Sequence, residues 1–201
     1  MTSERAGLPI IAFGSAAAWE AWLAAQPRDL KGLWLKIAKA GSGIATVSKQ
    51  GAIDGALCHG WIDGQLDKFD NDYWLIRFTP RKHRGKWSQV NRKRAEVLIA
   101  EGRVAPAGLA EIEAAKADGR WEAAYAPQST AEVPADLQAA FDADLIARAF
   151  FETLDSTNRY AILYRTGDAK KPETRAARIA KFVGMCARGE TIYPPRGKAK
   201  L

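Results

Sequence analysis

The segment from Ala56 to Glu96 holds the residue types most capable of chemistry in this chain. It contains both histidines, three of the seven tryptophans and a dense run of cationic side chains. The run from Arg81 to Lys86 alone places five side chains that can carry positive charge within six residues. Cationic groups beside aromatic rings favour an anionic ligand. We therefore take this segment as the candidate site and expect the rest of the chain to pack around it.

A polar interruption marks the helix predicted from Lys86 to Glu101. The expected apolar stripe of this helix consists of Trp87, Val90, Val97 and Leu98. Asn91 and Arg94 interrupt the stripe, because steps of three and four residues place them on the same side of the helix. Buried amide and guanidinium groups need hydrogen-bond partners. They form either a structural clamp onto backbone carbonyls and a carboxylate such as Asp63, or the lining of a pocket.

The start of the same helix is a second candidate for anion binding. Gly85 is its predicted N-cap, which leaves the backbone amides near Trp87 and Ser88 without acceptors inside the helix. The positive end of the helix and the basic run before it both favour a negatively charged group there.

Arg77 is the one charged residue in the otherwise apolar strand predicted from Tyr73 to Thr79. Side chains alternate along a strand, so Arg77 points away from the face that carries Trp74. Its charge either protects an exposed sheet edge or pairs with Asp63 or Asp67 on the preceding strand.

These patterns define a set of candidate ligand-binding residues. They are Trp61, Asp63, Arg77, Arg81, Trp87, Ser88, Asn91, Arg94, Lys170, Lys171 and Arg175. The tryptophans would supply stacking surface, the arginines and lysines charge, and the serine and asparagine orienting hydrogen bonds. Asp63 is also the candidate catalytic residue if the protein is an enzyme.

Familiar catalytic and metal-binding motifs do not occur in the sequence, which contains no CxxC, HExxH, GxSxG or GxGxxG. Cys58 and His59 are adjacent, and neighbours on a helix point about 100° apart, so they cannot pair as thiolate and imidazole. We therefore expect no metal and no cofactor.

The formal charge of +7 favours an anionic small molecule or an acidic partner, and it also allows nucleic acid. The two lone cysteines are typical of a reducing compartment. The apolar patch from Leu8 to Phe13 is too short for a signal peptide, and no apolar run approaches the ~20 residues that span a bilayer. We expect a cytoplasmic protein without membrane insertion, and the oligomeric state stays open.

Strands and helices do not alternate as repeated βαβ units, which predicts an α+β fold. A small antiparallel sheet covered by helices is expected first, followed by a helical C-terminal region. The predicted strands are Gly32 to Lys39, Trp61 to Asp67 and Tyr73 to Thr79, with a hairpin turn at Asp70 to Asp72. The predicted helices are Ser15 to Ala25, Lys49 to His59, Lys86 to Glu101 and Leu109 to Ala117, with Ser15 and Ser48 as N-caps.

The stretch from Ala126 to Val133 is poor in bulky residues and is the best domain boundary in the chain. Helices are then predicted at Pro134 to Asp142, at Leu145 to Leu154 with a continuation from Ser156 to Tyr164, and at Pro172 to Arg188. We predict an α+β region over residues 1–126, a helical region over 127–193 and a frayed basic tail over 194–201.

The last of these helices is expected to bury a stripe of Ala176, Ile179, Val183 and Cys186. Its basic edge of Lys170, Lys171 and Arg175 would then extend the positive surface that begins at Arg81. If this edge is a solvated binding surface, reversing the charge of Lys171 and Arg175 should leave folding nearly untouched.

Several short runs occur in an order and spacing that is specific to one family. They are Ala56 to Gly64, Arg77 to Arg81, Trp87-Ser88 with Asn91, Pro106 to Gly108, and Ala169 to Arg175. In these runs, and from about Trp19 to Gly189, the chain resembles the YdeI/OmpD-associated, bacteriocin-protection (OmdA-like) family. The resemblance implies tolerance of cationic antimicrobial peptides, association with the cell envelope and no established enzymatic activity.

Three functions follow from the sequence. The first is a cytoplasmic, non-enzymatic binding or stress-protection protein, with an anion held between the hairpin and the helix of residues 86–101. The second is a small-molecule enzyme in which Asp63 is the general base and Arg77 or Arg94 stabilises developing negative charge. Nucleic-acid binding is a lesser alternative, because no recognised nucleic-acid motif is present.

Overall fold

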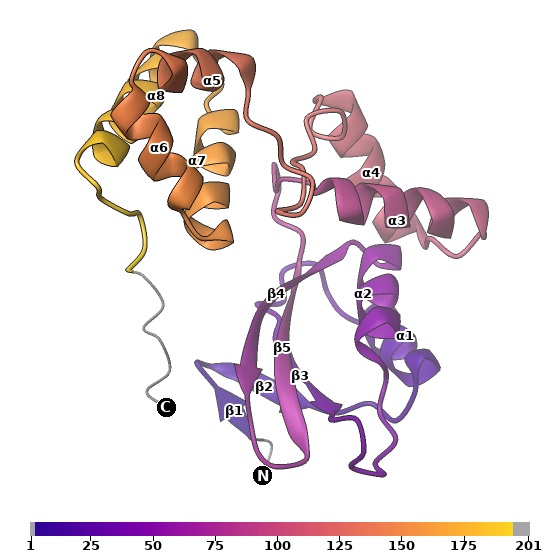
Figure 1. Ribbon diagram of the computed structural model, residues 1–201. Coiled ribbons are helices and arrows are strands. Elements are labelled where there is room, and N and C mark those ends of the chain that lie inside the picture. Colours follow the sequence, from indigo (N-terminus) through magenta and orange to yellow (C-terminus); the bar gives the residue numbers. More distant parts are fainter. Residues whose placement is uncertain (1–2, 195–201) are drawn as a thin grey trace. The chain divides into compact units, whose positions relative to one another are not determined.

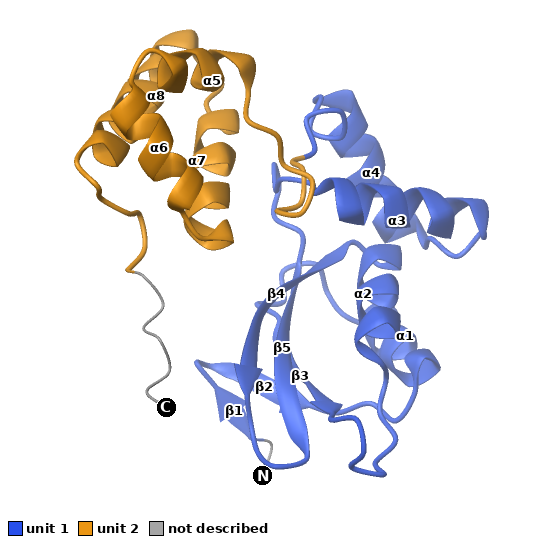
Figure 2. Cartoon of the chain, viewed as in Figure 1, with its two compact units in different colours: residues 1–124 blue, residues 125–201 orange. Residues whose placement is uncertain are grey.

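The computed structural model describes residues 3–194 and shows two compact units, residues 1–124 and residues 125–201 (Figure 2). The chain has an α+β fold, as the sequence predicts, with its strands in unit 1 and helices alone in the described part of unit 2. Residues 195–201 of the predicted basic tail lie outside the described residues. Among residues 3–194, no helix combines the length and the apolar character needed to cross a bilayer.

Unit 1 contains a mixed sheet with the strand order β1-β2-β3-β5-β4. The strands are β1 (Glu4–Arg5), β2 (Leu8–Ile11), β3 (Leu33–Ala38), β4 (Trp61–Lys68) and β5 (Tyr73–Pro80). The helices are α1 (Ala16–Ala24), α2 (Lys49–Cys58), α3 (Gln89–Ala100) and α4 (Pro106–Ala117).

The three predicted strands pair antiparallel as expected, but the prediction missed β1 and β2. The sheet is mixed because β2 runs parallel to β3, while β1 pairs antiparallel with β2. Only four residues long, β2 is too short to show a clear alternation in the sequence. It is joined to β1 by a two-residue turn at Ala6 and Gly7, whose φ angles of 50° and 71° suit a tight hairpin.

Helices α1 and α2 lie on one side of the sheet (Figure 1). The core between them holds side chains from both layers, including Trp19 of α1, Ala52 of α2, and Leu35 and Phe78 of the sheet. The opposite face carries a smaller cluster that contains Leu8, Trp34 and Leu75. Arg77 pairs in register with Trp34 and alternates with Phe78, so it lies on this second face.

Helix starts follow the local sequence at α1 and α2. The hydroxyl of Ser15 accepts a hydrogen bond from the Ala18 amide at 3.2 Å, and that of Ser48 accepts one from Gly51 at 3.1 Å. Both N-cap predictions are confirmed, because each cap satisfies an amide that has no partner inside the helix.

Unit 2 consists of α5 (Ala135–Asp142), α6 (Leu145–Thr153), α7 (Ser156–Gly167) and α8 (Pro172–Ala187). Helix α8 contacts the other three helices. The predicted continuation of α6 is a separate helix, because Asp155 caps α7 by accepting the Asn158 amide at 2.7 Å.

The predicted stripe of α8 is right at one end and wrong at the other. Cys186 is fully buried, while Ile179 and Val183 are half-buried against the same core. Ala176 is exposed, and Phe182, which the prediction omits, is buried. The N-terminal turn of the helix therefore projects beyond the core.

Candidate functional site

A groove of about 840 Å³ lies in unit 1, where β2 and β3 begin and β5 ends. Six of its lining side chains can carry positive charge: Arg28, Lys31, Arg77, Arg81, Lys82 and His83. Its other lining residues are Ala6, Gly7, Leu8, Leu30, Thr79 and Pro80. No Asp or Glu of the described chain is among the lining residues. We call this feature the basic groove.

Sheet topology brings the two sides of the basic groove together. Since β3 and β5 are antiparallel neighbours, the segment that enters β3 lies beside the segment that leaves β5. Gly32 makes this approach possible, because a Cβ at this position would stand 2.3 Å from the carbonyl oxygen of Phe78. Its φ of 109° also lies in the region that favours glycine. The glycine thereby places Lys31 next to the end of β5.

Arg77 occupies the sheet face opposite α1 and α2 and is half-buried. The predicted pairing with Asp63 or Asp67 is wrong, because no ion pair joins Arg77 to either one in the described chain. Asp67 instead binds Arg5, with Nη2 and Oδ2 2.6 Å apart. The Nε of Arg77 is shielded from solvent and has no hydrogen-bond partner among residues 3–194.

A bulge in β4 explains why the pairing fails. The register of β4 on β5 shifts between Asp63, which faces Phe78, and Leu66, which faces Ile76. Gly64 lies in this bulge, and a Cβ there would be 3.8 Å from the Cβ of Arg77. The neighbour of Arg77 on this edge therefore contributes no side chain.

Arg81 is 93% buried and stacks on Trp87, with its guanidinium carbon 3.6 Å from the ring centroid. The edge of the Trp87 ring meets Trp121, at a centroid distance of 4.8 Å. Trp61 is also fully buried, within the core beneath the sheet. Neither predicted stacking ring, Trp61 or Trp87, offers a free face to a ligand.

Arg28, one of the lining cations, is tied to the protein by an acidic partner. Its guanidinium forms an ion pair with Glu111 of α4 and donates a hydrogen bond to the His59 carbonyl at 3.4 Å. Lys31, Lys82 and His83 are exposed and form no ion pair among the described residues. These three side chains lie in solvent at the rim of the basic groove.

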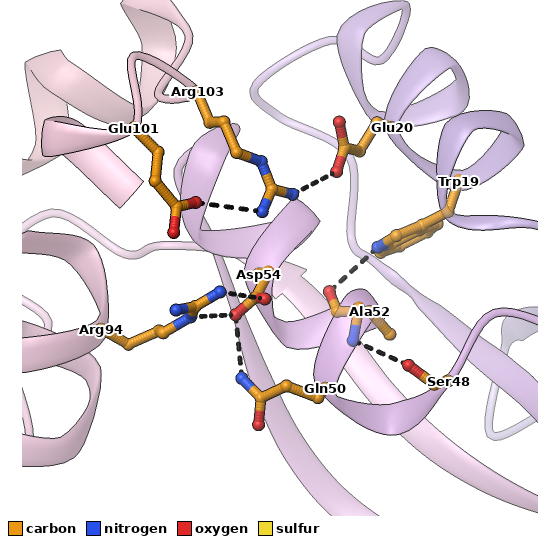
Figure 3. Close-up of polar contacts among 10 residues, drawn as sticks. Trp19, Glu20, Ser48, Gln50, Ala52, Asp54, Arg94, Glu101 and Arg103 are labelled. Carbon is orange, nitrogen blue, oxygen red and sulfur yellow. Dashed lines mark hydrogen bonds and ion pairs between the residues drawn. The ribbon is translucent and has the colours of Figure 1, made fainter. Parts of the chain in front are cut away.

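Arg94 belongs to a structural clamp rather than to the basic groove (Figure 3). Its Nε and Nη2 donate to the two carboxylate oxygens of Asp54, at 2.7 and 2.6 Å. Of the two readings of this helix face, the clamp is confirmed for Arg94, with Asp54 in place of Asp63 as its partner. The Asp54 side chain is 7% exposed and that of Arg94 is 31% exposed, so the carboxylate is largely removed from water while the guanidinium is partly solvated.

Burial by itself would raise the pKa of the Asp54 carboxyl group. The hydrogen bonds from Arg94 and Gln50, together with the charge of Arg94, outweigh burial and hold this pKa below its usual value. Asp54 is therefore an ionised structural group and is not a proton-transfer base.

Further contacts around the clamp tie α3 to α1 and α2 (Figure 3). Arg103 follows α3 and binds Glu20 of α1 at 3.0 Å, with Glu101 at 3.5 Å from its other terminal nitrogen. The indole of Trp19 donates to the Ala52 carbonyl at 3.0 Å. These contacts explain the polar residues here as supports of packing.

The prediction that Gly85 is the N-cap of α3 is wrong. The helix begins at Gln89, and the hydroxyl of Ser88 caps it by accepting the Asn91 amide at 3.1 Å. Gly85 precedes the helix in a turn, where its amide donates to the Lys82 carbonyl at 2.8 Å. Because Ser88 outcompetes Gly85 as a cap, Trp87 lies outside the helix.

The predicted apolar stripe of this helix is also wrong in part. Val90 and Val97 are 55% and 44% exposed, whereas Ala95 and Leu98 are buried. The buried face of α3 therefore passes through Ala95, which the predicted stripe omits.

The thiols of the chain are buried and form no part of the basic groove. Burial raises the pKa of Cys58 to about 11, and it raises that of Cys186 to the same value. Both are protonated at neutral pH, so neither is an activated nucleophile.

The predicted basic edge of unit 2 contains two exposed lysines, Lys170 and Lys171, and one clamped arginine. The Nε and Nη2 of Arg175 bind Asp136 at 2.5 and 2.8 Å, and its Nη1 donates to the Thr166 carbonyl at 3.0 Å. Arg175 thus joins α8 to α5 and to the end of α7.

We expect Arg175→Glu to lower the free energy of unfolding of unit 2 by about 1–2 kcal/mol, because it removes these bonds and places two carboxylates together. The matched change Lys171→Glu should cost less than about 0.5 kcal/mol. Urea unfolding followed by far-UV circular dichroism measures both. Equal effects of the two changes would show that Arg175 does not clamp the helices.

Two family models match the chain. The model described as a domain of unknown function (DUF8412) matches residues 11–111, which is half of the chain, and the chain therefore belongs to that family. Residues 130–189 match the model described as "Bacteriocin-protection, YdeI or OmpD-Associated". No curated protein and no solved structure matches the chain.

The predicted resemblance to the bacteriocin-protection family is confirmed over residues 130–189. The resemblance was predicted to begin at about Trp19, whereas the match to this family model begins at residue 130. The runs at Ala56 to Gly64, Arg77 to Arg81 and Pro106 to Gly108 fall within the match to DUF8412.

Among the predicted ligand-binding residues, Arg77 and Arg81 line the basic groove. Asp63, which is half-buried, is not among the lining residues, and neither are the other predicted residues of unit 1. The basic run in the sequence pointed to Lys82 and His83. Arg28 and Lys31 were missed, because their position depends on the pairing of β3 with β5.

Proposed function

We propose that the protein is a cytoplasmic, non-enzymatic binding protein whose basic groove holds an anion. One observation carries the proposal: six potentially cationic side chains line the groove, with no acidic residue of the described chain among the lining. Like charges gathered in a concave surface raise the local concentration of counter-ions. A bound anion relieves the repulsion among these cations.

Position within the groove gives these cations different roles. Arg77 is half-buried on the sheet and lacks an acidic partner in the described chain, so it anchors the anion in partly desolvated surroundings. Lys31 and Lys82 are exposed at the rim, where they steer the ligand and contribute less to affinity.

The composition of the lining favours binding over catalysis. No carboxylate or thiol of the described chain lines the groove, and Asp63 is not one of the lining residues. The imidazole of His83 is among the lining groups, but it is exposed at the rim. The enzymatic alternative based on Asp63 has no support from this geometry.

A role in protection against bacteriocins is the cellular part of the proposal. It is supported by the match of residues 130–189 to the family model whose description names bacteriocin protection. In this proposal unit 1 binds the anion and unit 2 supplies the protective activity.

Inorganic diphosphate is a suitable probe, measured by isothermal titration calorimetry. We expect the double change Lys31→Glu and Lys82→Glu to weaken its binding about tenfold or more, since two rim attractions become repulsions of ~1 kcal/mol each. Raising the salt concentration to about 0.5 M should also weaken binding.

Lys93→Glu is the matched control, because Lys93 is exposed on α3 and does not line the groove. It should change the affinity less than about twofold, through long-range charge alone. An affinity that is indifferent to salt, or equally reduced by the control and the rim variants, would falsify the proposed function.

A further inference from the structure

We propose that the ligand of the basic groove is a phosphate ester with an aliphatic body, an inference that rests on the anion-binding function proposed above. The charge of the lining selects the phosphate group. The apolar lining residues favour an aliphatic group attached to that phosphate.

More than one positive charge in the groove is left unbalanced by the protein. Glu111 balances Arg28, but Lys31, Arg77 and Lys82 have no acidic partner in the described chain. A carboxylate would supply a single negative charge to these three cations. A phosphate monoester carries about 1.5 to 2 negative charges at neutral pH and offers three acceptor oxygens. It therefore matches the lining better in charge and in number of acceptors.

Apolar residues form most of the remaining lining, with Thr79 as the polar exception. Leu8, Leu30 and Pro80 lie among the cations, and Leu8 and Pro80 are buried while Leu30 is half-buried. At about 840 Å³ the groove is within the range of small-molecule sites, and it exceeds what a lone phosphate ion requires. The ligand thus extends beyond its phosphate group along apolar surface.

The aliphatic body is favoured over a nucleobase by the types of side chain present. No Trp, Tyr or Phe of the described chain lines the groove. The face of the nearby Trp87 is covered by Arg81. Proteins commonly hold bases by stacking them on aromatic rings, and the groove has no such platform.

A series of alkyl phosphates tests the inference directly. We would titrate the full chain with inorganic phosphate and with butyl, hexyl and octyl phosphate below their micelle concentrations. Affinity should rise about two- to fourfold for each methylene that enters the groove, because burial of a methylene from water is favourable. Octyl phosphate should bind at least about tenfold more tightly than inorganic phosphate, octanoate or adenosine monophosphate.

Two variants separate the polar and apolar contributions. Arg77→Gln should weaken all the phosphates by a similar factor. Leu30→Ala should reduce the affinity gained per methylene by a larger factor than it reduces the affinity for inorganic phosphate. Since Leu30 also packs on the core, the folding of each variant is checked by tryptophan fluorescence. If Leu30→Ala does not fold, the alkyl phosphate titrations of the unaltered protein still test the inference.

Vesicles distinguish a membrane lipid from a soluble ester as the source of the phosphate. If octyl phosphate displaces the protein from phosphatidic acid vesicles, the proposed chemistry holds for a lipid head group. If the protein binds octyl phosphate but does not bind the vesicles, the ligand is a soluble phosphate ester.

The results that overturn the inference differ from those that overturn the proposed function. Equal affinity for inorganic and octyl phosphate, equal affinity for octanoate, or tighter binding of adenosine monophosphate would reject the aliphatic ester while keeping an anion site. Absence of binding by every anion in the series, diphosphate included, would reject both.

Discussion

Replacing Arg94 with methionine is expected to lower the free energy of unfolding of unit 1 by about 2–4 kcal/mol. The change keeps most of the apolar contact of the side chain but leaves the Asp54 carboxylate buried without its guanidinium partner. Gln50 retains one hydrogen bond to it, at 2.9 Å, which cannot balance the charge. Removing one member of a buried pair costs more than the pair itself contributes to stability.

Tryptophan fluorescence measures this effect in unit 1 specifically, since all seven tryptophans precede residue 125. Urea unfolding of Arg94→Met should be compared with Glu113→Ala, which removes an exposed partner of Lys116. The control should cost less than about 0.5 kcal/mol.

A double-mutant cycle tests the same explanation. Adding Asp54→Leu to Arg94→Met removes the stranded charge, so the double variant should recover much of the lost stability. A double variant less stable than Arg94→Met would show that the cost came from lost packing.

The pH dependence gives an independent check. The pKa of Asp54 is lowered in the folded protein, so its contribution to stability is fully present above its unfolded pKa of about 3.8 and is lost as the pH falls below that value. In Arg94→Met the unpaired, buried carboxylate should have a raised pKa, so protonation stabilises this variant. The stability difference between the two proteins should therefore begin to narrow above about pH 4, where the carboxyl group of the variant is protonated, and continue to narrow below it.

Local chemistry is the part of this fold that the sequence predicts well. Ser15 and Ser48 cap the helices expected of them, because a cap depends on amides only three residues away. The hairpin around residues 70–72 follows from the same short range: the carboxylate of Asp70 accepts the amides of Asp72 and Tyr73 at 2.9 and 2.8 Å.

Long-range partners could not be predicted from the same patterns. Asp54 lies on a helix where a carboxylate ordinarily faces water, and only the packing of α3 on α2 makes it the partner of Arg94. Pairing across the hairpin is one of the two roles predicted for Arg77, but the bulge at Gly64 shifts the register. A bulge changes the pairing register between two strands, but the alternation of apolar and polar residues in the sequence of each strand does not reveal it.

The lining of the basic groove could also be predicted only in part from the sequence. The charge run after β5 marks one side of it, whereas Leu30 and Lys31 carry no distinguishing pattern. They join the site because β5, the last strand in sequence, lies between β3 and β4 in the sheet. Strand order is a global property, so it is not encoded in any single segment.

Gly108→Ala is expected to destabilise unit 1 by about 2–3 kcal/mol, against the usual trend for helices. Alanine is favoured over glycine within a helix by about 1 kcal/mol. At position 108, however, a Cβ would stand 2.3 Å from the Cys58 carbonyl oxygen and 2.9 Å from that of Leu57. Both atoms belong to the backbone of α2, so the clash requires α4 and α2 to separate.

That separation would also strain the bond from the Ala105 amide to the Cys58 carbonyl, which measures 3.0 Å. Ala110→Gly, on the exposed side of the same helix, is the comparison variant. It should lower the free energy of unfolding by about 1 kcal/mol through helix propensity alone. Urea unfolding by tryptophan fluorescence measures both variants. Gly108→Ala and Ala110→Gly, although opposite substitutions in one helix, should thus both destabilise unit 1. Gly108→Ala should have the larger effect. A neutral or stabilised Gly108→Ala would mean that the two helices can move apart at no cost, and the close contact would then not determine their packing.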